Sequence, residues 1–355
     1  MNVIDPDQFD LSGYRMPAEW EPHEATWLAW PSNAETWPET LPEVQTVWIQ
    51  MAEHLSRGEH VHFLANNPRD ADDIRHRLRA SSAVQENVSV HVIPNNDAWM
   101  RDSGPIFLVA RDRREPSLLA NDFVFNSWGK KYGPWEDDDI IPRRLAAMIG
   151  CPVIAHDLVL EGGSIDVNGQ GLLLTTRQCL LNPNRNPHLS QNEIEARLKT
   201  YLGVSSIIWL GDGIEGDDTD GHIDDIARFV GPNTIVTVVE KDSKDPNFEP
   251  LQMNLQILRE ARNLDGVPFE IIELPMPERR EGPFGRSPAS YANFYIGNAV
   301  VLVPIYSSPQ DAVALDRLRP CFPGREVIGI ECTPVAAGLG AIHCVTQQQP
   351  ALPAV

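Results

Sequence analysis

A recurrence at intervals of roughly sixty residues constrains the fold of this chain more than any other feature of its sequence. A helix pattern, a short apolar strand, a polar segment and a second apolar strand follow one another repeatedly. One landmark residue per polar segment gives separations of 62, 60, 69 and 51 residues, the landmarks being Asp102, Ser164, Asp224, Asn293 and Cys344. A ring of similar modules produces such a period, but ordinary α/β proteins also alternate helices and strands, so the spacing alone leaves both architectures open.

The periodicity of apolar residues predicts an α/β chain in which each module has one amphipathic helix and about three strands. Helices are expected at residues 41–57, 70–81, 141–149, 191–201, 251–262 and 309–318. Strands are expected at residues 60–65, 88–93, 106–110, 152–155, 172–176, 205–210, 226–230, 234–239, 268–274, 299–305 and 326–330. Residues 275–288, rich in Pro and Gly, are expected to form a long loop. Since no low-complexity linker divides the sequence, residues 1–355 are predicted to form a single domain.

The charge of the chain argues against several classes of partner. Asp and Glu number 50 against 29 Lys and Arg, a net charge of −21. Such a field disfavours nucleic acids and anionic membranes and favours cationic ligands, although acidity can also serve solubility alone. The polar, acidic start lacks the pattern of a signal peptide, and no apolar stretch is long enough to span a membrane. We therefore expect a cytoplasmic protein, and the sequence leaves open whether it forms a homo-oligomer.

The five cysteines are irregularly spaced, and none forms a CxxC pair; they are Cys151, Cys179, Cys321, Cys332 and Cys344. Neither a disulfide framework nor a zinc site is indicated, and free thiols are expected. Phosphate-binding and serine-hydrolase motifs are also missing from the sequence. No metal or cofactor is predicted.

Cys344 is the cysteine best suited to be a nucleophile. It follows small residues and glycines in AAGLGAIHCVTQQQP, which would let a ligand approach closely. The alternative is a buried structural thiol, the interpretation we keep for the other four cysteines. If this segment is a strand, His343 faces away from Cys344 and is not its base.

His222 and Asp224 lie two residues apart in GDDTDGHIDD. In a strand this spacing places both side chains on one face, where they can act as an acid–base pair. The alternatives are a solvated acidic turn or a calcium loop. The calcium loop fails, because Gly216 and Ala227 would occupy ligand positions.

Three further candidates lie in two other polar segments. Asp102 in NDAWMRDSGP could bind a cation, with Trp99 against the face or alkyl tail of that ligand; the alternative is a turn Asp with a core Trp. Glu161 opens EGGS, where two glycines free the backbone beside a carboxylate, or else is an exposed turn residue. Carboxylates, a cysteine and a histidine are together the set needed to hydrolyse a guanidinium group, which is planar and carries five N–H donors.

Seven segments in order resemble the agmatine deiminases, a branch of the bacterial-type peptidylarginine deiminase family. They are MPAEWEPHEATWLAWP, NDAWMRDSGP, FNSWGKKY, LEGGSIDVNGQG, LLTTRQCLLNPNRNP, DDTDGHIDDIARF and AIHCVTQQQP, and they extend from Tyr14 to Pro350. The resemblance implies the five-bladed α/β propeller (pentein) of the guanidino-modifying superfamily, with pseudo-five-fold repeats around a central active site. It also implies a single catalytic domain, a cofactor-free deiminase and a covalent amidino-cysteine intermediate.

The resemblance also implies roles for individual residues. Cys344 matches the nucleophile, His222 the general acid and base, Asp102 and Asp224 the guanidinium-binding carboxylates, and Glu161 the carboxylate near the histidine and substrate. For the substrate's tail, the matching residues are Trp99, Asp97 and Asp218. The sequence departs from many relatives in the shorter glycine run before IHC and at the second Asp of HIDD.

The implied reaction is hydrolysis of agmatine, a small cationic guanidino substrate, to N-carbamoylputrescine and ammonia in putrescine biosynthesis. Free arginine, methylated arginine and peptidyl-arginine are alternative substrates for the same chemistry. A non-catalytic propeller used as a binding scaffold would be expected to lack one of the reactive residues. A metal-dependent hydrolase would need a second histidine at ligand spacing, which the acidic segment around His222 does not supply.

Overall fold

Five sheets of three to five strands, together with one isolated hairpin, make up the β-structure of residues 3–352, the part of the computed structural model that is described. Each sheet contains the same unit of three strands. The first strand pairs antiparallel with the second, and the second pairs parallel with the third. Because a parallel pair needs a crossover connection, a helix lies between the second and third strands of every unit.

The strands of two sheets come from residues 3–210. One has the order β1 (Val3–Ile4), β8 (Val153–Val159), β7 (Leu118–Val124), β6 (Ile106–Ala110) and β2 (Tyr14–Arg15). The next has the order β11 (Ser206–Leu210), β10 (Leu172–Thr176) and β9 (Ile165–Val167).

Two more sheets come from the second half, and a fifth joins the two ends of the chain. They have the orders β12 (Ala227–Gly231), β13 (Thr234–Val239), β14 (Glu270–Pro275), and β17 (Tyr295–Ile296), β18 (Val300–Ile305), β19 (Glu326–Glu331). The fifth contains β20 (Gln347–Pro350), β3 (His23–Ala29), β4 (His60–Ala65) and β5 (Val88–Val92). Its β20 is the first strand of the repeated unit, so the unit is completed only when the C-terminal strand pairs with β3.

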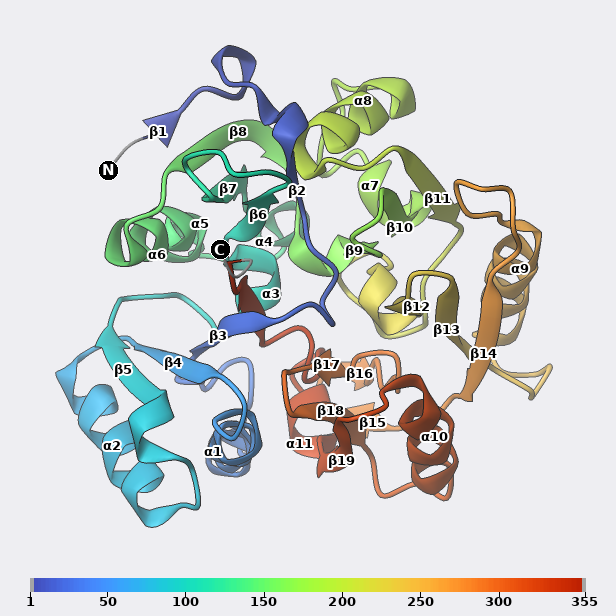
Figure 1. Ribbon diagram of the computed structural model, residues 1–355. Coiled ribbons are helices and arrows are strands. Elements are labelled where there is room, and N and C mark those ends of the chain that lie inside the picture. Colours follow the sequence, from blue (N-terminus) through green and yellow to red (C-terminus); the bar gives the residue numbers. More distant parts are fainter. Residues whose placement is uncertain (1–2, 353–355) are drawn as a thin grey trace.

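The long helices are α1 (Leu41–Leu55), α2 (Pro68–Ala80), α6 (Ile141–Ile149), α8 (Gln191–Leu202), α9 (Phe248–Glu260) and α10 (Gln310–Leu318). Helices α2, α6, α8, α9 and α10 lie at the periphery, and the sheets lie around the centre of the molecule (Figure 1). Short helical turns complete the elements: α3 (Met100–Ser103), α4 (Ser127–Lys130), α5 (Glu136–Asp139), α7 (Arg177–Leu180), α11 (Thr333–Ala336), η1 (Pro6–Gln8), η2 (Leu11–Gly13), η3 (Gln85–Asn87), η4 (Gly162–Ser164), η5 (Ile223–Asp225) and η6 (Arg319–Cys321).

Local sequence signals set the ends of these helices. Ser190 and Glu193 form a reciprocal capping box that begins α8. Gly150 and Gly203 end α6 and α8 in the left-handed conformation that glycine adopts without steric cost. Each long helix then buries one apolar face; α1, for example, buries Val44, Val47, Trp48, Met51 and Leu55.

The predicted helices and strands are confirmed in order, with ends shifted by a few residues. Strands β3, β7 and β20, which belong to two of the sheets, were not predicted, and neither were the short strands β1, β2, β9 and β17. The expected loop at residues 275–288 contains a hairpin of β15 (Glu281–Gly282) and β16 (Gly285–Arg286). The prediction of free thiols is confirmed, since all five cysteines are unpaired. Among residues 3–352, no helix combines the length and the apolarity that crossing a bilayer requires.

Candidate active site

Each of the five polar segments directly precedes the first strand of one sheet. Helix α3 precedes β6, η4 precedes β9 and η5 precedes β12. Residues 290–294 and 341–346, which are irregular or in turns, precede β17 and β20. Because the first strands lie on the central side of their sheets (Figure 1), these five segments meet at one place. Two of the landmarks, Asp102 and Cys344, line one cavity, and two more, Asp224 and Asn293, lie next to the sulfur of Cys344.

Asp102, on α3, is held by donors from two other segments. Gly163 N donates to its Oδ1 at 2.8 Å and Trp128 Nε1 donates to its Oδ2 at 2.9 Å. The indole reaches this position because residues 127–130 all have positive φ, a conformation that costs roughly 1–2 kcal/mol for each residue other than glycine. Burial raises the pKa of Asp102 to about 6; nearby Asp224 adds to the rise, while His222 opposes it.

Gly163 is the point around which three candidates converge. A Cβ at this position would lie 2.5 Å from His222 Nδ1, 2.8 Å from Asp102 Oδ1 and 3.1 Å from Asp224 Oδ2. All three side chains are buried. The glycine of EGGS is therefore required for close approach of two carboxylates and a histidine.

The prediction that His222 and Asp224 lie on a strand is wrong. His222 immediately precedes η5, and Asp224 lies within it. A short helical turn, and not one face of a strand, brings both side chains to the site. The i, i+2 argument was wrong in its geometry, although the two side chains do converge.

Cys344 lies in a turn and is held by Asn293. Asn293 Nδ2 donates to Cys344 Sγ at 3.1 Å, and Sγ lies 3.8 Å from Asp224 Oδ2. Burial, reinforced by Asp224, Asp225 and Asp102, raises the pKa of this thiol well above its usual range. The thiol is therefore neutral when only the protein surrounds it.

If residues 343 and 344 lay on a strand, His343 would face away from the site. It faces the site instead, because the segment is not a strand. Residues 342–345 form a turn, and His343 Nδ1 lies 2.7 Å from Asp224 Oδ2. Its Nε2 lies 2.8 Å from Glu19 Oε2, a buried carboxylate that also pairs with Arg228 and Arg101. His343 lowers the pKa of Asp224, although burial alone would raise it. This buried network therefore keeps Asp224 ionised beside the thiol.

His222 is held as a cation. Burial opposes its charge, but Asp102, 3.8 Å from His222 Nδ1, and Cys179 raise its pKa well above the usual range. Among residues 3–352, no hydrogen bond joins Glu161 to His222, and Glu161 Oε1 accepts from Arg185 Nε at 2.6 Å. Within residues 3–352, Glu161 Oε2 and His222 Nε2 have no hydrogen-bond partner. Glu161 is near the histidine but is ion-paired to Arg185.

Three atoms capable of binding a metal meet behind the site, one each from Glu161, Cys179 and His222, within 4.8 Å of one another. All three residues are buried, and none lines the cavity that leads to Cys344 and Asp102. Because Arg185 already neutralises the Glu161 carboxylate, the donor set suits a metal only after that ion pair is broken. Sequence spacing had left Cys179 among the structural thiols.

A cavity of about 600 Å³ leads from the surface to Cys344 and Asp102. Its walls are aromatic, formed by Trp99, Phe125, Trp128, Tyr132, Trp135 and Phe284. Lys131 is the one basic side chain among its described lining residues, whereas the lining acids are Glu35, Asp97, Asp102, Asp138 and Asp218. The cavity suits an elongated cation with an apolar middle.

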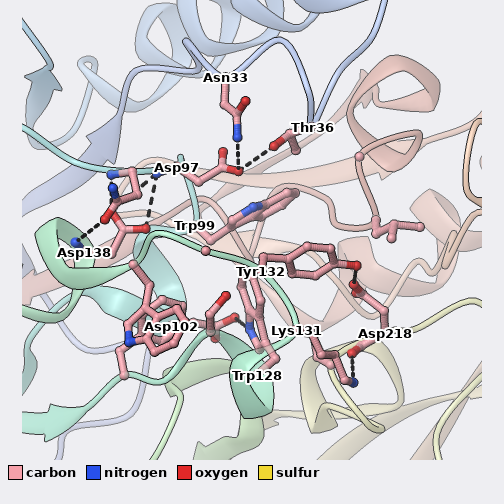
Figure 2. Close-up of a pocket in the computed structure, with 18 of the residues that line it drawn as sticks. Asn33, Thr36, Asp97, Trp99, Asp102, Trp128, Lys131, Tyr132, Asp138 and Asp218 are labelled. Atoms are coloured by element: carbon pink, nitrogen blue, oxygen red, sulfur yellow. Dashed lines mark hydrogen bonds between the residues drawn. The ribbon is translucent and has the colours of Figure 1, made fainter.

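Trp99, Asp97 and Asp218, the residues assigned to the substrate's tail, all line this cavity. Asp97 Oδ2 accepts from Asn33 and Thr36, and Asp218 Oδ2 accepts from Tyr132 OH at 2.5 Å (Figure 2). Burial raises the pKa of both carboxyl groups. These two acids are separate from the cluster at the closed end.

Several residues that shape the site were not selected from the sequence. Asn293 served only as a landmark in SYANFYIGN, and Trp128 and Glu19 lie in FNSWGKKY and MPAEWEP, two segments quoted for their resemblance alone. The one sequence signal for Trp128 and Glu19 was that they lie inside segments that resemble the deiminase family. The residues to which they hydrogen-bond are distant in the sequence; Glu19 and His343, for example, are 324 residues apart.

Comparison with known proteins gives a consistent result. The family model of Porphyromonas-type peptidyl-arginine deiminases matches residues 15–350. A relative named agmatine deiminase, from Pseudomonas aeruginosa (strain LESB58), is 38% identical over 362 residues, covering 96% of each chain.

Two solved structures described as agmatine deiminases are also similar. That of the Enterococcus faecalis enzyme has a TM-score of 0.90 at 32% identity and covers 99% of both chains. A variant of the C. jejuni enzyme with substrate bound has a TM-score of 0.85 at 33% identity, covering 95% of this chain and 96% of the other. The mixed α/β fold is thus shared over nearly the whole length.

Proposed function

Because this chain belongs to the Porphyromonas-type peptidyl-arginine deiminase family, we propose that it is an agmatine deiminase. It is a hydrolase acting on the carbon–nitrogen bonds of linear amidines. Its reaction converts agmatine and water into N-carbamoylputrescine and ammonia. This product is a precursor of putrescine, so the reaction belongs to polyamine synthesis.

The observation that carries this proposal is the chemistry of the cavity from end to end. Its closed end places a thiol and the Asp102 carboxylate together, as attack on a guanidinium carbon requires. Its aromatic walls suit a butyl chain, and its outer acids suit an amine. Agmatine has both, and it has no α-carboxylate. Arginine would bring that carboxylate against Asp97 and Asp218, and Lys131 is committed to Asp218 O and Asp220.

In the proposed mechanism, Asp102 and Asp224 bind the guanidinium nitrogens and place the central carbon against Cys344. The arriving cation offsets the carboxylates that raise the pKa of the thiol, so Cys344 releases its proton to solvent as the substrate binds. Substrate binding and activation of the nucleophile are therefore one event. Electrostatic preorganisation of this kind is a major contribution to catalysis.

The covalent steps then follow in order. Thiolate attack forms a C–S bond and a tetrahedral adduct. The adduct collapses by breaking one C–N bond, and His222 donates a proton to the departing ammonia. His222 then takes a proton from water, whose oxygen attacks the amidino-cysteine. The C–S bond breaks with its electron pair returning to sulfur, the proton on the attacking oxygen passes to the Cys344 thiolate, and the ureido product leaves. One water is consumed and one ammonia released. Glu161, paired with Arg185, contributes to the buried surroundings of His222.

The proposal extends to architecture. The five sheets would be the blades of a five-bladed α/β propeller, with residues 1–355 as a single catalytic domain. The shared three-strand unit, its fivefold occurrence and the central meeting of the polar segments support this architecture. We also place the protein in the cytoplasm, where its five free thiols are compatible with a reducing environment. The proposed reaction uses protein side chains and one water molecule.

Replacing the nucleophile tests the mechanism most directly. Cys344→Ser should abolish release of ammonia and formation of the ureido product, because a serine hydroxyl is a far weaker nucleophile here. Mass spectrometry of quenched wild-type turnover should show an amidine adduct on the Cys344 peptide. Cys332→Ala removes another buried thiol, one that does not line the cavity, and is the matched control. Retained activity in Cys344→Ser, or an adduct on another cysteine, would overturn the mechanism.

Substrate choice needs a separate comparison. We expect kcat/KM for agmatine to exceed that for free arginine, methylated arginine and a blocked arginine peptide by about a hundredfold or more, since an unpaired carboxylate against buried acids is strongly disfavoured. Steady-state kinetics on the four substrates provide the measurement. Preference for arginine or the peptide would assign the chain to a different deiminase activity.

A further inference from the structure

Asn293 is the one side chain, among residues 3–352, that donates a hydrogen bond to the sulfur of Cys344. The two atoms are 3.1 Å apart, and Asn293 is completely buried. Asn293 lies just before β17, in a different sheet from β20, which follows Cys344. The contact therefore joins the nucleophile to a separate segment of the chain.

The partners of Asn293 determine which end of its amide faces the sulfur. Its Oδ1 accepts from His343 N at 2.9 Å and lies 3.4 Å from Cys344 N, both of which can only donate. Its Nδ2 donates to Asp225 Oδ1 at 3.0 Å as well as to Sγ. Exchanging the amide oxygen and nitrogen would place the NH2 group of Asn293 against these two backbone N–H donors, and neither donor would then have an acceptor in this side chain. The N–H end must therefore face the sulfur.

The other charged groups near this sulfur do not stabilise a thiolate. Asp224, Asp225 and Asp102 raise the pKa of Cys344, and His343 contacts Asp224 rather than Sγ. His222 Nδ1 pairs with Asp102 and not with Sγ. A fixed cation at the sulfur would favour the thiolate but would also repel a guanidinium substrate. A neutral N–H donor avoids this conflict, because it stabilises the anion without adding charge.

We propose that Asn293 is a catalytic residue whose side-chain N–H stabilises the thiolate of Cys344. It acts as the nucleophile forms its C–S bond and again when that bond breaks and the sulfur regains its electron pair. Its oxygen meanwhile fixes the turn that carries the nucleophile. This inference rests on the proposed role of Cys344 and adds a partner to it.

The test measures the thiol separately from turnover. Iodoacetamide alkylates thiolates, so the pH dependence of its reaction with the Cys344 peptide, followed by mass spectrometry, reports the pKa of Cys344. In Asn293→Ala, alkylation below that pKa should be slower by about tenfold or more, because a hydrogen bond to a charged acceptor is lost. kcat should fall while KM for agmatine changes little, since Asn293 does not line the cavity.

Asn254→Ala is the matched control, because Asn254 is an equally buried amide that binds Gly211 N and Asp212 O away from the cavity. It should leave alkylation unchanged. If Asn293→Ala fails to fold by circular dichroism, Asn293→Asp retains an acceptor for His343 N. At alkaline pH its carboxylate opposes the thiolate, so alkylation should again be slower than in the wild type.

Wild-type alkylation in either folded variant would overturn the inference even if Cys344→Ser is inactive. An active Cys344→Ser would instead overturn the proposed mechanism, whatever the alkylation rates. The two failures are thus separable.

Discussion

The closed end and the mouth of the cavity are both acidic, but their acids are held in different ways. At the closed end, Asp102 and Asp224 are buried and receive hydrogen bonds from a backbone N–H, an indole and a histidine of other segments. At the mouth, Asp97 and Asp218 are only partly buried, and their carboxylates accept mainly from hydroxyl and amide side chains.

The difference indicates two functions for negative charge. Acids fixed by the backbone of several sheets can define positions to within a fraction of an ångström, as bond-breaking requires. Acids held by flexible side chains near solvent attract a cation without fixing its position, because water screens them. Changes at the closed end should therefore lower kcat, and changes at the mouth should raise KM.

Among the three substitutions that test this comparison, the largest effect is expected from Gly163→Ala, which adds one methyl group at the closed end. The new Cβ would meet His222 and Asp102 at less than 3 Å, so at least one of them must shift. A displacement of about 1 Å at a reacting centre costs roughly a hundredfold in rate, and we expect kcat to fall at least that far.

Steady-state kinetics on folded protein measure this effect. Gly231→Ala, where a Cβ would approach nothing closer than 3.8 Å, is the control and should remain active. Near-normal kcat in Gly163→Ala would mean that the closed end is far less constrained than the comparison implies.

Trp128 links the cavity wall to the closed end, and a smaller effect is expected from Trp128→Phe. The indole N–H stabilises the Asp102 carboxylate, whose pKa is about 6. Since the ionised carboxylate is the form that binds a guanidinium, kcat/KM should rise with pH through this pKa. Loss of the N–H raises the pKa, so this acidic limb should move to higher pH, by up to about one unit.

The pH profile of kcat/KM from about pH 5 to pH 9 measures the shift, and these limits bracket the relevant pKa range. At low pH the variant should be up to about tenfold slower, and at high pH it should approach the wild type. If the acidic limb of the kcat/KM profile stays at its wild-type pH, a group other than Asp102 controls that limb.

The smallest effect is expected from Asp218→Asn at the mouth. A partly exposed carboxylate contributes about 0.2–1 kcal/mol to an ion pair, so KM for agmatine should rise by no more than about fivefold and kcat should stay nearly constant. The rise should shrink in high salt. Asp242→Asn removes the same charge from an exposed loop position outside the cavity and should have no effect. A large loss of kcat in Asp218→Asn would place Asp218 in the chemistry and end the distinction between the two regions.

Local sequence patterns predicted the elements well, because helix and strand periodicity depend on neighbouring residues. The strand at 60–65 and the helix at 141–149 were predicted with their observed bounds. The prediction failed where the decisive partner is remote. Strand β20 is a short glutamine-rich segment that becomes a strand only by pairing with β3, more than 300 residues earlier.

The sequence by itself determined the helices, most strands and, through resembling segments, Cys344, His222, Asp102 and Asp224 as the reactive set. Tertiary structure alone decided how that set is supported: Asn293 on the sulfur, Glu19 beneath His343, and Arg185 on Glu161. The physical reason is that local pattern specifies which face of an element is apolar, whereas hydrogen bonds at the centre join backbone positions that approach only after the sheets have packed.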